Sequence, residues 1–225
     1  MQISIALATF NGSKYLNDQL ISLACQKLLP YEVIVVDDGS TDETLEIVKN
    51  FASNVSFPVR IYKNETKLGY GLNFLKAAGF CSGDAIAFCD QDDEWSPDKL
   101  VRVVEAIMVH KADFVVHSAE VVNETLNFTG SRYHDIVKDN IFGSEILREK
   151  FYPGFAISIT KRFFTNLKKI TMQQGFFVDA HDEFICEHAE RGWRRYEISK
   201  SLVNYRQHQS NLIGYHDAIK KQRVA

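Results

Sequence analysis

The sequence contains no long hydrophobic run. No window approaches the roughly 18 uninterrupted apolar residues that a membrane-spanning helix needs. The first residues, MQISIALATFN, are apolar, yet they have neither the basic start nor the small-residue cleavage site of a signal peptide. We therefore expect a cytoplasmic protein that is either free or held at the inner face of the cell membrane.

Basic stripes and paired cysteines are also missing. The formal net charge is −3 and no Lys/Arg block is longer than KK or RR, so the composition argues against a nucleic-acid partner. The four cysteines lie far apart without a C-x-x-C pair. We expect them to be structural, reduced thiols in buried segments, at positions 25, 81, 89 and 186.

Two phosphate-binding signatures are absent as well. Neither G-x-x-x-x-G-K-[ST] nor a G-x-G-x-x-G after the first predicted strand occurs. The stretch KLGYGLNF at 67–74 has two glycines that would let a ligand approach the backbone, but as a motif it is weak. The charge of a phosphorylated ligand would therefore have to be met mainly by a metal ion.

The sequence does contain a regular alternation of strands and helices. With 225 residues and 45% hydrophobic content, it is expected to form a single domain, 1–225, with halves 1–112 and 113–225. Ser13 is a plausible cap of the helix predicted at 13–27, and Pro97 suits the first position of the helix predicted at 97–110. In the first half the predicted strands are 3–9, 32–38, 59–64 and 84–90, and the predicted helices are 13–27, 40–51, 71–80 and 97–110.

This alternation predicts an α/β fold with a mainly parallel, twisted sheet and helices on both of its faces. Ligands of such sheets bind beyond the carboxyl ends of the strands, and VDDGS and CDQDD both lie at such ends. After residue 113 the pattern loosens, with predicted strands at 113–122, 155–160 and 200–208 and predicted helices at 161–170 and 182–192.

Two aspartates, Asp90 and Asp92, stand in D-x-D spacing directly after a predicted buried strand. Their mutual repulsion falls if a divalent cation lies between or beside them, and carboxylate oxygens suit Mg²⁺ or Mn²⁺. Such ions usually keep a substrate phosphate among their ligands, so the pair predicts a phosphorylated ligand. Asp93 and Asp98 have a simpler alternative role as caps of the helix near Pro97.

A second acidic pair, Asp37 and Asp38, ends the predicted strand 32–38. Gly39 permits a tight turn into the next helix, whose N-terminus favours nearby negative groups. For Asp37, capping of this turn and a ligand contact are equally good interpretations. Asp38 is expected to face the ligand.

Six stretches carry a family resemblance: LATFNGSKYLNDQLIS, VIVVDDGSTDETL, NETKLGYGLNFLKA, GDAIAFCDQDDEWSPDKL, HDEFI and NYRQHQSN. Together they resemble the family 2 glycosyltransferases with the GT-A fold, particularly bacterial rhamnosyltransferase-like members that build surface polysaccharides. The pairing of VDDGSTD with a later D-x-D is the most specific part of the likeness. The resemblance implies a Rossmann-like, mainly parallel sheet flanked by helices, with a small antiparallel extension on the acceptor side.

The resemblance implies roles at the nucleotide-sugar site. Ala8, Thr9 and Phe10 would form the rim around the nucleotide base, with Phe10 offering an aromatic face. Asp38 would accept a hydrogen bond from the base. Asn73 would line the nucleotide-sugar pocket.

The resemblance also implies a metal site. Asp90 would approach the ribose and the water shell of the metal, and Gln91 would lie beside it in the nucleotide-sugar site. Asp92 would bind the metal, Mn²⁺ or Mg²⁺, directly. His208 falls where some members add a further metal or diphosphate contact.

Asp182 corresponds to the catalytic base of the family. His181 before it matches the HD form of the rhamnosyltransferase-like branch. Glu183 and Phe184 stand where that branch often has tryptophans, a difference that concerns the acceptor more than the base. From the residues alone, an acid at a helix start could equally be a helix cap.

The implied reaction is an inverting, metal-dependent transfer of a sugar, with rhamnose one candidate, from a UDP- or dTDP-sugar to a hydroxyl of a glycan or lipid-linked acceptor. A nucleotidyltransferase is an alternative, although TFNGSKY has only one glycine and one lysine where such enzymes typically hold a triphosphate. A non-catalytic nucleotide-sugar-binding protein on the same fold is another. A processive membrane synthase is excluded, because spanning helices and Q-x-x-R-W are missing.

The tail GYHDAIKKQRVA at 214–225 leaves open a peripheral membrane contact or a homodimer through a short amphipathic helix. So short a helix is marginal on its own, which favours a solvated end.

Overall fold

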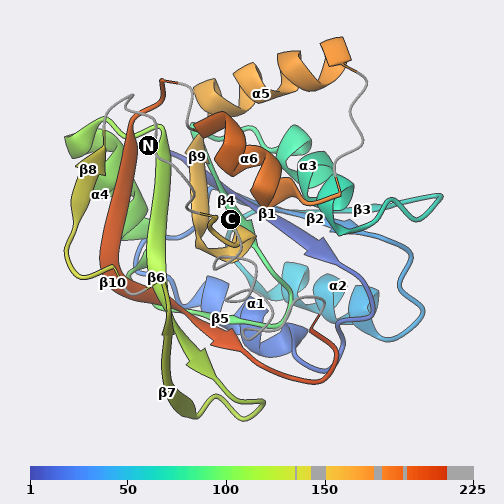
Figure 1. Ribbon diagram of the computed structural model, residues 1–225. Helices are drawn as coiled ribbons and strands as arrows, with labels where there is room; N and C mark the ends of the chain where they lie inside the picture. Colours follow the sequence, from blue (N-terminus) through green and yellow to red (C-terminus); the bar gives the residue numbers. More distant parts are fainter. Residues whose placement is uncertain (135, 143–150, 175–178, 190–191, 212–225) are drawn as a thin grey trace.

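The computed structural model describes residues 1–134, 136–142, 151–174, 179–189 and 192–211. These residues form a ten-stranded sheet with helices on both faces (Figure 1). The predicted α/β class is thereby confirmed, with a parallel first half and antiparallel pairings in the second. The tail at 214–225 lies outside the described residues.

Four parallel strands come from the first half and pair in the order β3-β2-β1-β4. They are β1 (Ile3–Thr9), β2 (Glu32–Asp37), β3 (Val59–Lys63) and β4 (Ala85–Cys89). Every residue of β1, β2 and β4 is buried, which explains why these strands are nearly continuous apolar runs. Their carboxyl ends meet at one edge of the sheet and bring VDDGS and CDQDD to the same place.

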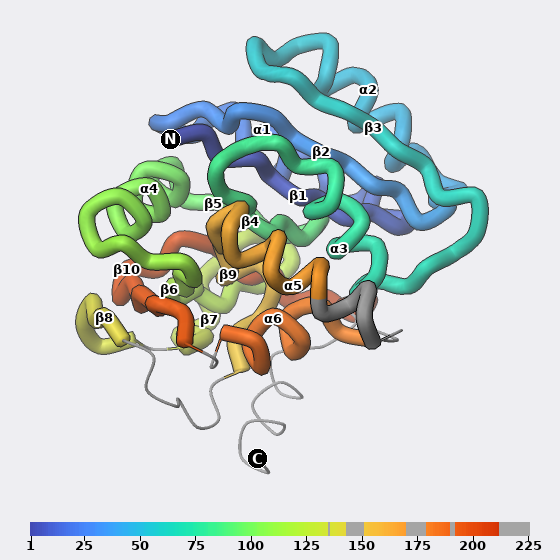
Figure 2. Tube along the Cα trace, turned by 90° about the horizontal axis from the view of Figure 1, so that it is seen from above, coloured from blue at the N-terminus to red at the C-terminus, as the bar shows by residue number. Residues whose placement is uncertain are grey.

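Helices cover both faces of the sheet. One face carries α1 (Leu16–Ala24), α2 (Thr44–Asn54) and α4 (Lys99–His110). The other face carries α3 (Tyr70–Phe80), α5 (Lys161–Gln174) and α6 (His181–Ala189). Successive strand residues point to opposite faces, so β1 supplies Ile5 to one core and Ala6 to the other. Figure 2 shows α2 on one side of the strands and α3, α5 and α6 on the other.

Six further strands complete the sheet. They are β5 (Glu94–Trp95), β6 (Phe114–Val122), β7 (Phe128–Tyr133), β8 (Asn140–Phe142), β9 (Ile157–Thr160) and β10 (Arg195–Arg206). β9 lies antiparallel between β4 and β6, and β10 runs parallel to β6. A turn of 3-10 helix, Gly154–Ala156, directly precedes β9. The second half of the chain is therefore joined to the first through the pairing of β4 with β9.

Several predicted boundaries were wrong. α1 begins at Leu16 and not at Ser13, because the Ser13 amide donates to Asp42 Oδ2 (3.0 Å) instead of entering the helix. α2 begins at Thr44, after the Ser40 hydroxyl has bonded Asp37. α4 begins at Lys99, two residues after Pro97, and the strand expected at 200–208 is already formed at Arg195. β5, β7 and β8 were not predicted.

The surface also departs from one sequence expectation. Cys25 is exposed at the end of α1, whereas Cys81, Cys89 and Cys186 are buried as predicted, and all four are free thiols.

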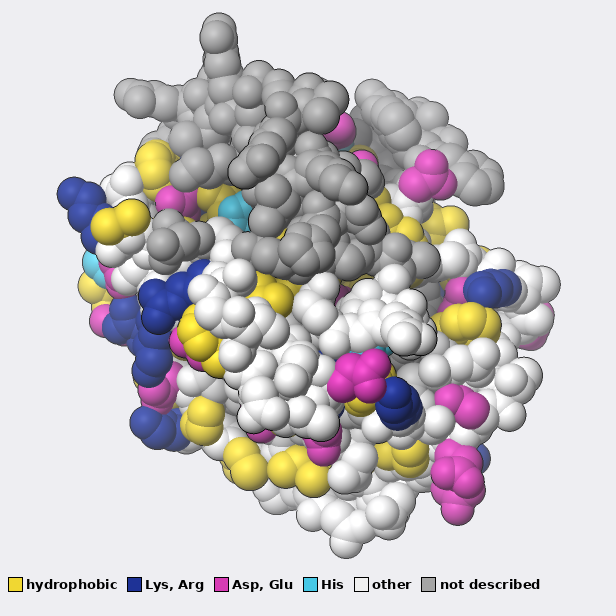
Figure 3. Space-filling view, turned by 60° about the horizontal axis from the view of Figure 1, so that its bottom comes forward, with side chains coloured by type: hydrophobic (Ala, Val, Ile, Leu, Met, Phe, Trp, Pro, Cys, Tyr) yellow, Lys and Arg dark blue, Asp and Glu magenta, His cyan; other side chains and the backbone are white. Residues whose placement is uncertain are grey.

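Acidic and basic side chains are interspersed on the face shown in Figure 3. None of the helices in the described residues has the length and apolarity to cross a membrane.

Candidate active site

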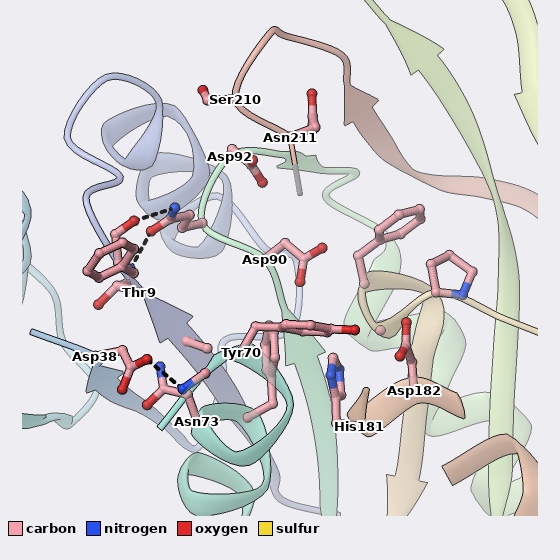
Figure 4. Close-up of a pocket in the computed structure, with 18 of the residues that line it drawn as sticks. Thr9, Asp38, Tyr70, Asn73, Asp90, Asp92, His181, Asp182, Ser210 and Asn211 are labelled. Carbon is pink, nitrogen blue, oxygen red and sulfur yellow. Dashed lines mark hydrogen bonds between the residues drawn. The ribbon is translucent and has the colours of Figure 1, made fainter. Parts of the chain in front are cut away.

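The carboxyl ends of β1, β2 and β4 open into a cavity of about 540 Å³ (Figure 4). From the second half, the segment that precedes β9 and the start of α6 form its far wall. All the predicted site residues except His208 line this cavity: Ala8, Thr9, Phe10, Asp38, Asn73, Asp90, Gln91, Asp92 and Asp182. His208 does not line the cavity but contacts Asp92, with 2.9 Å between Nε2 and Oδ2.

Asp38 organises the loop that leads into α3. Its buried carboxylate accepts hydrogen bonds from the side chain of Asn64 (2.8 Å) and from the amides of Leu68 (2.7 Å) and Gly69 (2.9 Å). The Oδ2 atom accepts only the Gly69 bond among the described residues, which leaves it capacity for one more. The structure thus gives Asp38 a structural task besides the predicted contact with a base.

Asn73 reaches the cavity wall from α3, but its amide group is already engaged. It donates to the carbonyl of Val36 (2.8 Å) and accepts from Asn64 (2.9 Å). Asn64 therefore links Asp38 and Asn73, a role that the sequence analysis missed. Only the strand-end position of Asn64, after β3, could have signalled it.

The turn after β2 is held by Asp37. Its carboxylate accepts from the Ser40 amide (2.9 Å) and from the Thr9 hydroxyl (3.1 Å), and Gly39 adopts a φ of +92° beside it. Asp37 is buried and is not among the residues that line the cavity. Of its two interpretations, the structure supports turn capping.

Phe10 and Gln91 form the rim of the cavity. The Phe10 amide donates to Gln91 Oε1 (2.9 Å), and Gln91 Nε2 donates back to the Phe10 carbonyl (3.1 Å). This pair depends on Gly12, where a Cβ atom would lie 2.2 Å from Gln91 Oε1. The Nζ atom of Lys67 lies 3.6 Å from the centroid of the Phe10 ring, so a cation, which the sequence analysis missed, occupies a face of this ring.

Three acids cluster beyond β4. One carboxylate oxygen from each of Asp90, Asp92 and Asp93 lies within 4.8 Å of the other two. Burial, together with the charges of Asp92 and Asp182, raises the pKa of Asp90 to about 8. Burial and the charges of Asp92 and Asp90 raise the pKa of Asp93 well above its usual range. A divalent cation would relieve this repulsion, and three carboxylates are the hard oxygen ligands that Mg²⁺ or Mn²⁺ prefers.

Asp93 does not act as the helix cap that was its simpler interpretation. One of its oxygens accepts from the Arg206 amide (3.0 Å), and the other has no hydrogen-bond partner among the described residues. A buried, unpartnered carboxylate oxygen fits a cation site better than a cap. Asp98 stands at the N-cap position of α4 without a capping hydrogen bond, and its carboxylate pairs instead with Lys27 and Lys200.

Arg206 joins the end of β10 to the acidic loop, residues 90–93, that follows β4. Its buried guanidinium donates to the carbonyl of Asp92, to the carbonyl of Glu124 and to the carboxylate of Asp18, each at 2.8 Å. His208, two residues later, is thereby brought to Asp92. The stretch NYRQH contained this signal, but only its histidine was singled out.

Lys99 is a further basic residue that the sequence analysis missed. It is fully buried, lies 3.5 Å from the centroid of the Trp95 ring and donates to the carbonyl of Phe155 (2.7 Å). Burial lowers its pKa to about 7, against the opposing pull of nearby acidic groups that include Asp93 and Asp90. Lys99 thus connects the acidic cluster with the segment that forms the far wall.

Asp182 lies on that far wall, in the first turn of α6 and buried to 6% exposure. Its Oδ1 atom accepts from the amide of Glu183 (3.0 Å), and its charge lies near the positive end of the α6 dipole. Figure 4 shows Asp182 across the cavity from Asp38 and on the same side as His181. At this position Asp182 can contact a molecule that binds on the side of the cavity formed by the second half of the chain.

Comparisons with known proteins show the family of the chain. A sequence model of the family described as Glycosyl transferase family 2 matches residues 4–166. The dTDP-rhamnosyl transferase RfbG of Shigella flexneri is 27% identical, over 95% of this chain and 75% of its own length. An uncharacterized glycosyltransferase of Nostoc sp. is 29% identical, over 55% of this chain and 38% of its own length.

Among solved structures, S. aureus TarS 1-349 in complex with UDP matches with a TM-score of 0.75 and 23% identity, over 92% of this chain and 61% of the TarS chain. Its complex with UDP-GlcNAc matches with a TM-score of 0.75 and 24% identity, over 94% and 60%. At this identity the likeness concerns the fold. The chain spans less than two thirds of the Nostoc relative and of the TarS chain.

Proposed function

The chain belongs to glycosyl transferase family 2, and from that premise we propose that it transfers a sugar, with inversion, from a UDP- or dTDP-sugar to a hydroxyl group of a glycan or lipid-linked acceptor. The named relative RfbG supports a dTDP-sugar such as dTDP-rhamnose, and the TarS complexes support a uridine nucleotide. Surface polysaccharide synthesis is the matching role. The pairing of β4 with β9 supports treating 1–225 as one domain.

One observation carries the proposal: acids from both halves of the sequence face the same cavity. Asp38, Asp90 and Asp92 come from strand ends of the first half, and Asp182 comes from a helix of the second. A nucleotide sugar bound along the strand ends would place its diphosphate at the acidic cluster. Its sugar would then point toward Asp182.

In the proposed reaction, Asp182 takes the proton from the acceptor hydroxyl as a general base. The acceptor oxygen forms a bond to the anomeric carbon from the face opposite the diphosphate. The bond between that carbon and the diphosphate oxygen breaks, and the nucleoside diphosphate leaves with the electron pair. One displacement of this kind inverts the anomeric configuration.

The chain's own acids suit a divalent metal in this reaction. Asp92 and Asp90 would hold Mn²⁺ or Mg²⁺, with Asp93 behind them and His208 orienting Asp92. When bound, the ion would offset the charge that grows on the leaving diphosphate. The raised pKa of Asp90 reflects its burial and the repulsion from the neighbouring acids.

The test is a donor panel. UDP- and dTDP-linked glucose, galactose, N-acetylglucosamine and rhamnose are screened by thermal shift with and without Mn²⁺, because a bound ligand raises apparent stability. Turnover of the stabilising donor is then measured with saccharide acceptors. We expect metal-dependent release of nucleoside diphosphate. Release of pyrophosphate would indicate a nucleotidyltransferase, and tight binding without any turnover would indicate a binding protein.

A matched pair of variants tests the metal site. Asp92→Asn should abolish metal-dependent turnover, whereas Glu46→Gln, an exposed acid on α2, should leave it unchanged. Full metal-dependent activity in a folded Asp92→Asn variant would refute the assignment of Asp92.

A further inference from the structure

Tyr70 occupies the centre of the cavity. It is the first residue of α3 and follows Gly69, whose amide is held by Asp38 (2.9 Å) and whose φ is +82°. In Figure 4 its side chain extends from the nucleotide side toward His181 and Asp182, with Asp90 above it. A loop anchored at the donor end of the cavity thus aims a phenol at the far wall.

The Tyr70 hydroxyl has no hydrogen-bond partner within the part of the chain that the structure describes, although its side chain is half-buried. Burial, reinforced by the charge of Asp182 and then by acids that include Asp90, raises the pKa of Tyr70 to about 12. The phenol therefore stays protonated and can donate a hydrogen bond. When they are ionised, carboxylates such as Asp90 and Asp182 accept hydrogen bonds but cannot donate them.

His181 lies next to Tyr70 and is also unsatisfied. It is 2% exposed, its ring stacks on Phe74 with 4.0 Å between centroids, and neither ring nitrogen has a partner among the described residues. Gly154 lies close to its edge, since a Cβ atom at 154 would come within 2.3 Å of Nε2. Burial lowers the pKa of His181 to about 3, so the imidazole is neutral and keeps one donor and one acceptor.

A buried imidazole without hydrogen-bond partners is unfavourable, and the half-buried Tyr70 beside it presents a hydroxyl that can donate to a molecule in the cavity. If the proposed function holds, the transferred sugar must lie between the diphosphate at Asp90 and Asp92 and the acceptor hydroxyl at Asp182. Tyr70 and His181 lie in this interval. A sugar offers hydroxyl groups that both donate and accept, as well as apolar faces that pack on aromatic rings.

We propose that Tyr70 and His181 line the subsite of the transferred sugar, with Tyr70 donating a hydrogen bond to one of its hydroxyl groups and the His181 ring forming the wall beside that hydroxyl. This inference rests on the proposed function and specifies its donor-sugar subsite. Tyr70 is then a specificity-determining residue of the reaction. The nucleotide part of the donor, bound nearer Asp38, does not touch it.

The experiment compares the wild type with Tyr70→Phe, which removes only the hydroxyl, and with Tyr31→Phe as the control. Tyr31 is 38% exposed and precedes β2, at the end of the strand away from the cavity. Calorimetry gives the affinity for the donor found in the panel and for its nucleoside diphosphate alone. Steady-state kinetics give kcat and KM for the same donor.

We expect Tyr70→Phe to weaken binding of the nucleotide sugar and lower kcat/KM about tenfold, as the loss of one neutral hydrogen bond does. Affinity for the nucleoside diphosphate should stay within about twofold, and Tyr31→Phe should match the wild type in every measurement. A deoxy donor that lacks the contacted hydroxyl should remove the difference between wild type and Tyr70→Phe. His181→Met places flexible apolar atoms where the imidazole was. Like Tyr70→Phe, it should lower the preference for the favoured donor sugar over the other donors.

Equal affinities and kinetics of Tyr70→Phe and the wild type with every donor would overturn this inference while leaving the proposed function intact. A parallel loss for the sugar donor and the free nucleoside diphosphate would also overturn it, because Tyr70 would then act on the nucleotide or on the fold. A wild-type protein that binds nucleotide sugars without turnover refutes the proposed activity, yet the ratio of sugar-donor to nucleotide affinity still tests Tyr70. Absence of any nucleotide-sugar binding would overturn both.

Discussion

The first half of the molecule presents its cavity residues from the carboxyl ends of three neighbouring parallel strands. The second half presents Asp182 from a helix start and the adjoining wall from a 3-10 turn, which Lys99 contacts through the Phe155 carbonyl. In the first half, topology alone brings Asp38 and Asp90 to one edge of the sheet. In the second half, placement depends on individual buried contacts between segments that are distant in sequence.

This difference has a mechanistic consequence. Residues such as Asp38 and Asn73 are held by hydrogen bonds to the loop 64–69, so substitutions there should act on the nucleotide end. The far wall is reached by Lys99, which donates to the Phe155 carbonyl, and Arg206 joins the last strand to the acidic loop at Asp92. Substitutions at such contacts should affect stability and both ends of the cavity together.

Asp182→Asn should produce the largest effect, and it tests most directly whether the two halves of the chain have separate roles in donor binding and in catalysis. We expect kcat to fall about 1,000-fold, because the general base is lost, while affinity for the nucleotide sugar is nearly unchanged. Single-turnover kinetics and calorimetry measure the two quantities. Glu187→Gln, an exposed acid on the same helix, is the control. A matching loss of donor affinity would show that Asp182 also builds the nucleotide site.

Arg206→Met should destabilise the whole protein. The change removes the hydrogen bonds of a buried guanidinium to two carbonyls and one carboxylate, and we expect it to cost about 3 kcal/mol in free energy of unfolding. Urea denaturation measures it. Lys27→Met, which breaks a surface ion pair of a 65% exposed side chain, should cost less than about 1 kcal/mol. Equal costs would mean that the two halves do not depend on this contact.

His181 should make the far wall sensitive to acid. Its pKa in the folded protein, about 3, lies below the ordinary 6.5, so the unfolded chain takes up this proton first and stability is lost as the pH falls from 6.5 toward 3. Between about pH 7.5 and about pH 5 this loss amounts to about 2 kcal/mol.

His181→Met should therefore lose about 2 kcal/mol less than the wild type over that interval, measured by urea denaturation at both pH values. Asp90 acts in the opposite direction, because its raised pKa makes the folded form take up a proton first, and its contribution cancels when the two proteins are compared. Tyr70→Phe should follow the wild type. An unchanged pH dependence in His181→Met would show that the imidazole takes up a proton in the folded protein.

Gly12→Ala should have the smallest effect, and it is confined to the nucleotide rim. The new Cβ atom would displace the side chain of Gln91 and release its two hydrogen bonds with Phe10, at a cost of about 1 kcal/mol in stability. Gly79→Ala is the matched control, because that helical glycine has open space and should gain up to about 1 kcal/mol. If thermal denaturation showed stability changes of the same sign in both variants, residue 12 would not approach Gln91 as closely as the structure has it.

Local patterns predicted the parallel half well. The apolar runs of β1, β2 and β4 and the amphipathic spacing of the helices lie within short windows, and strand-end acids can be placed by the rule for parallel sheets. Boundaries were less accurate, because Ser13 bonds the distant Asp42 and Ser40 bonds back to Asp37, in place of the caps that their spacing indicated. β5, β7 and β8 are too short or too exposed to leave a clear period in the sequence.

The sequence by itself determined the α/β class, the order of the first four strands along the chain and the acids at their ends, because these follow from side-chain periodicity and residue type within a few positions. Only the tertiary structure decided that Arg206 reaches Asp92 across 114 positions, that Lys99 is buried beside the acids and that Tyr70 and His181 meet in one cavity. Such contacts form when distant segments pack around a common core. A packed contact of this kind leaves no regular trace along the chain.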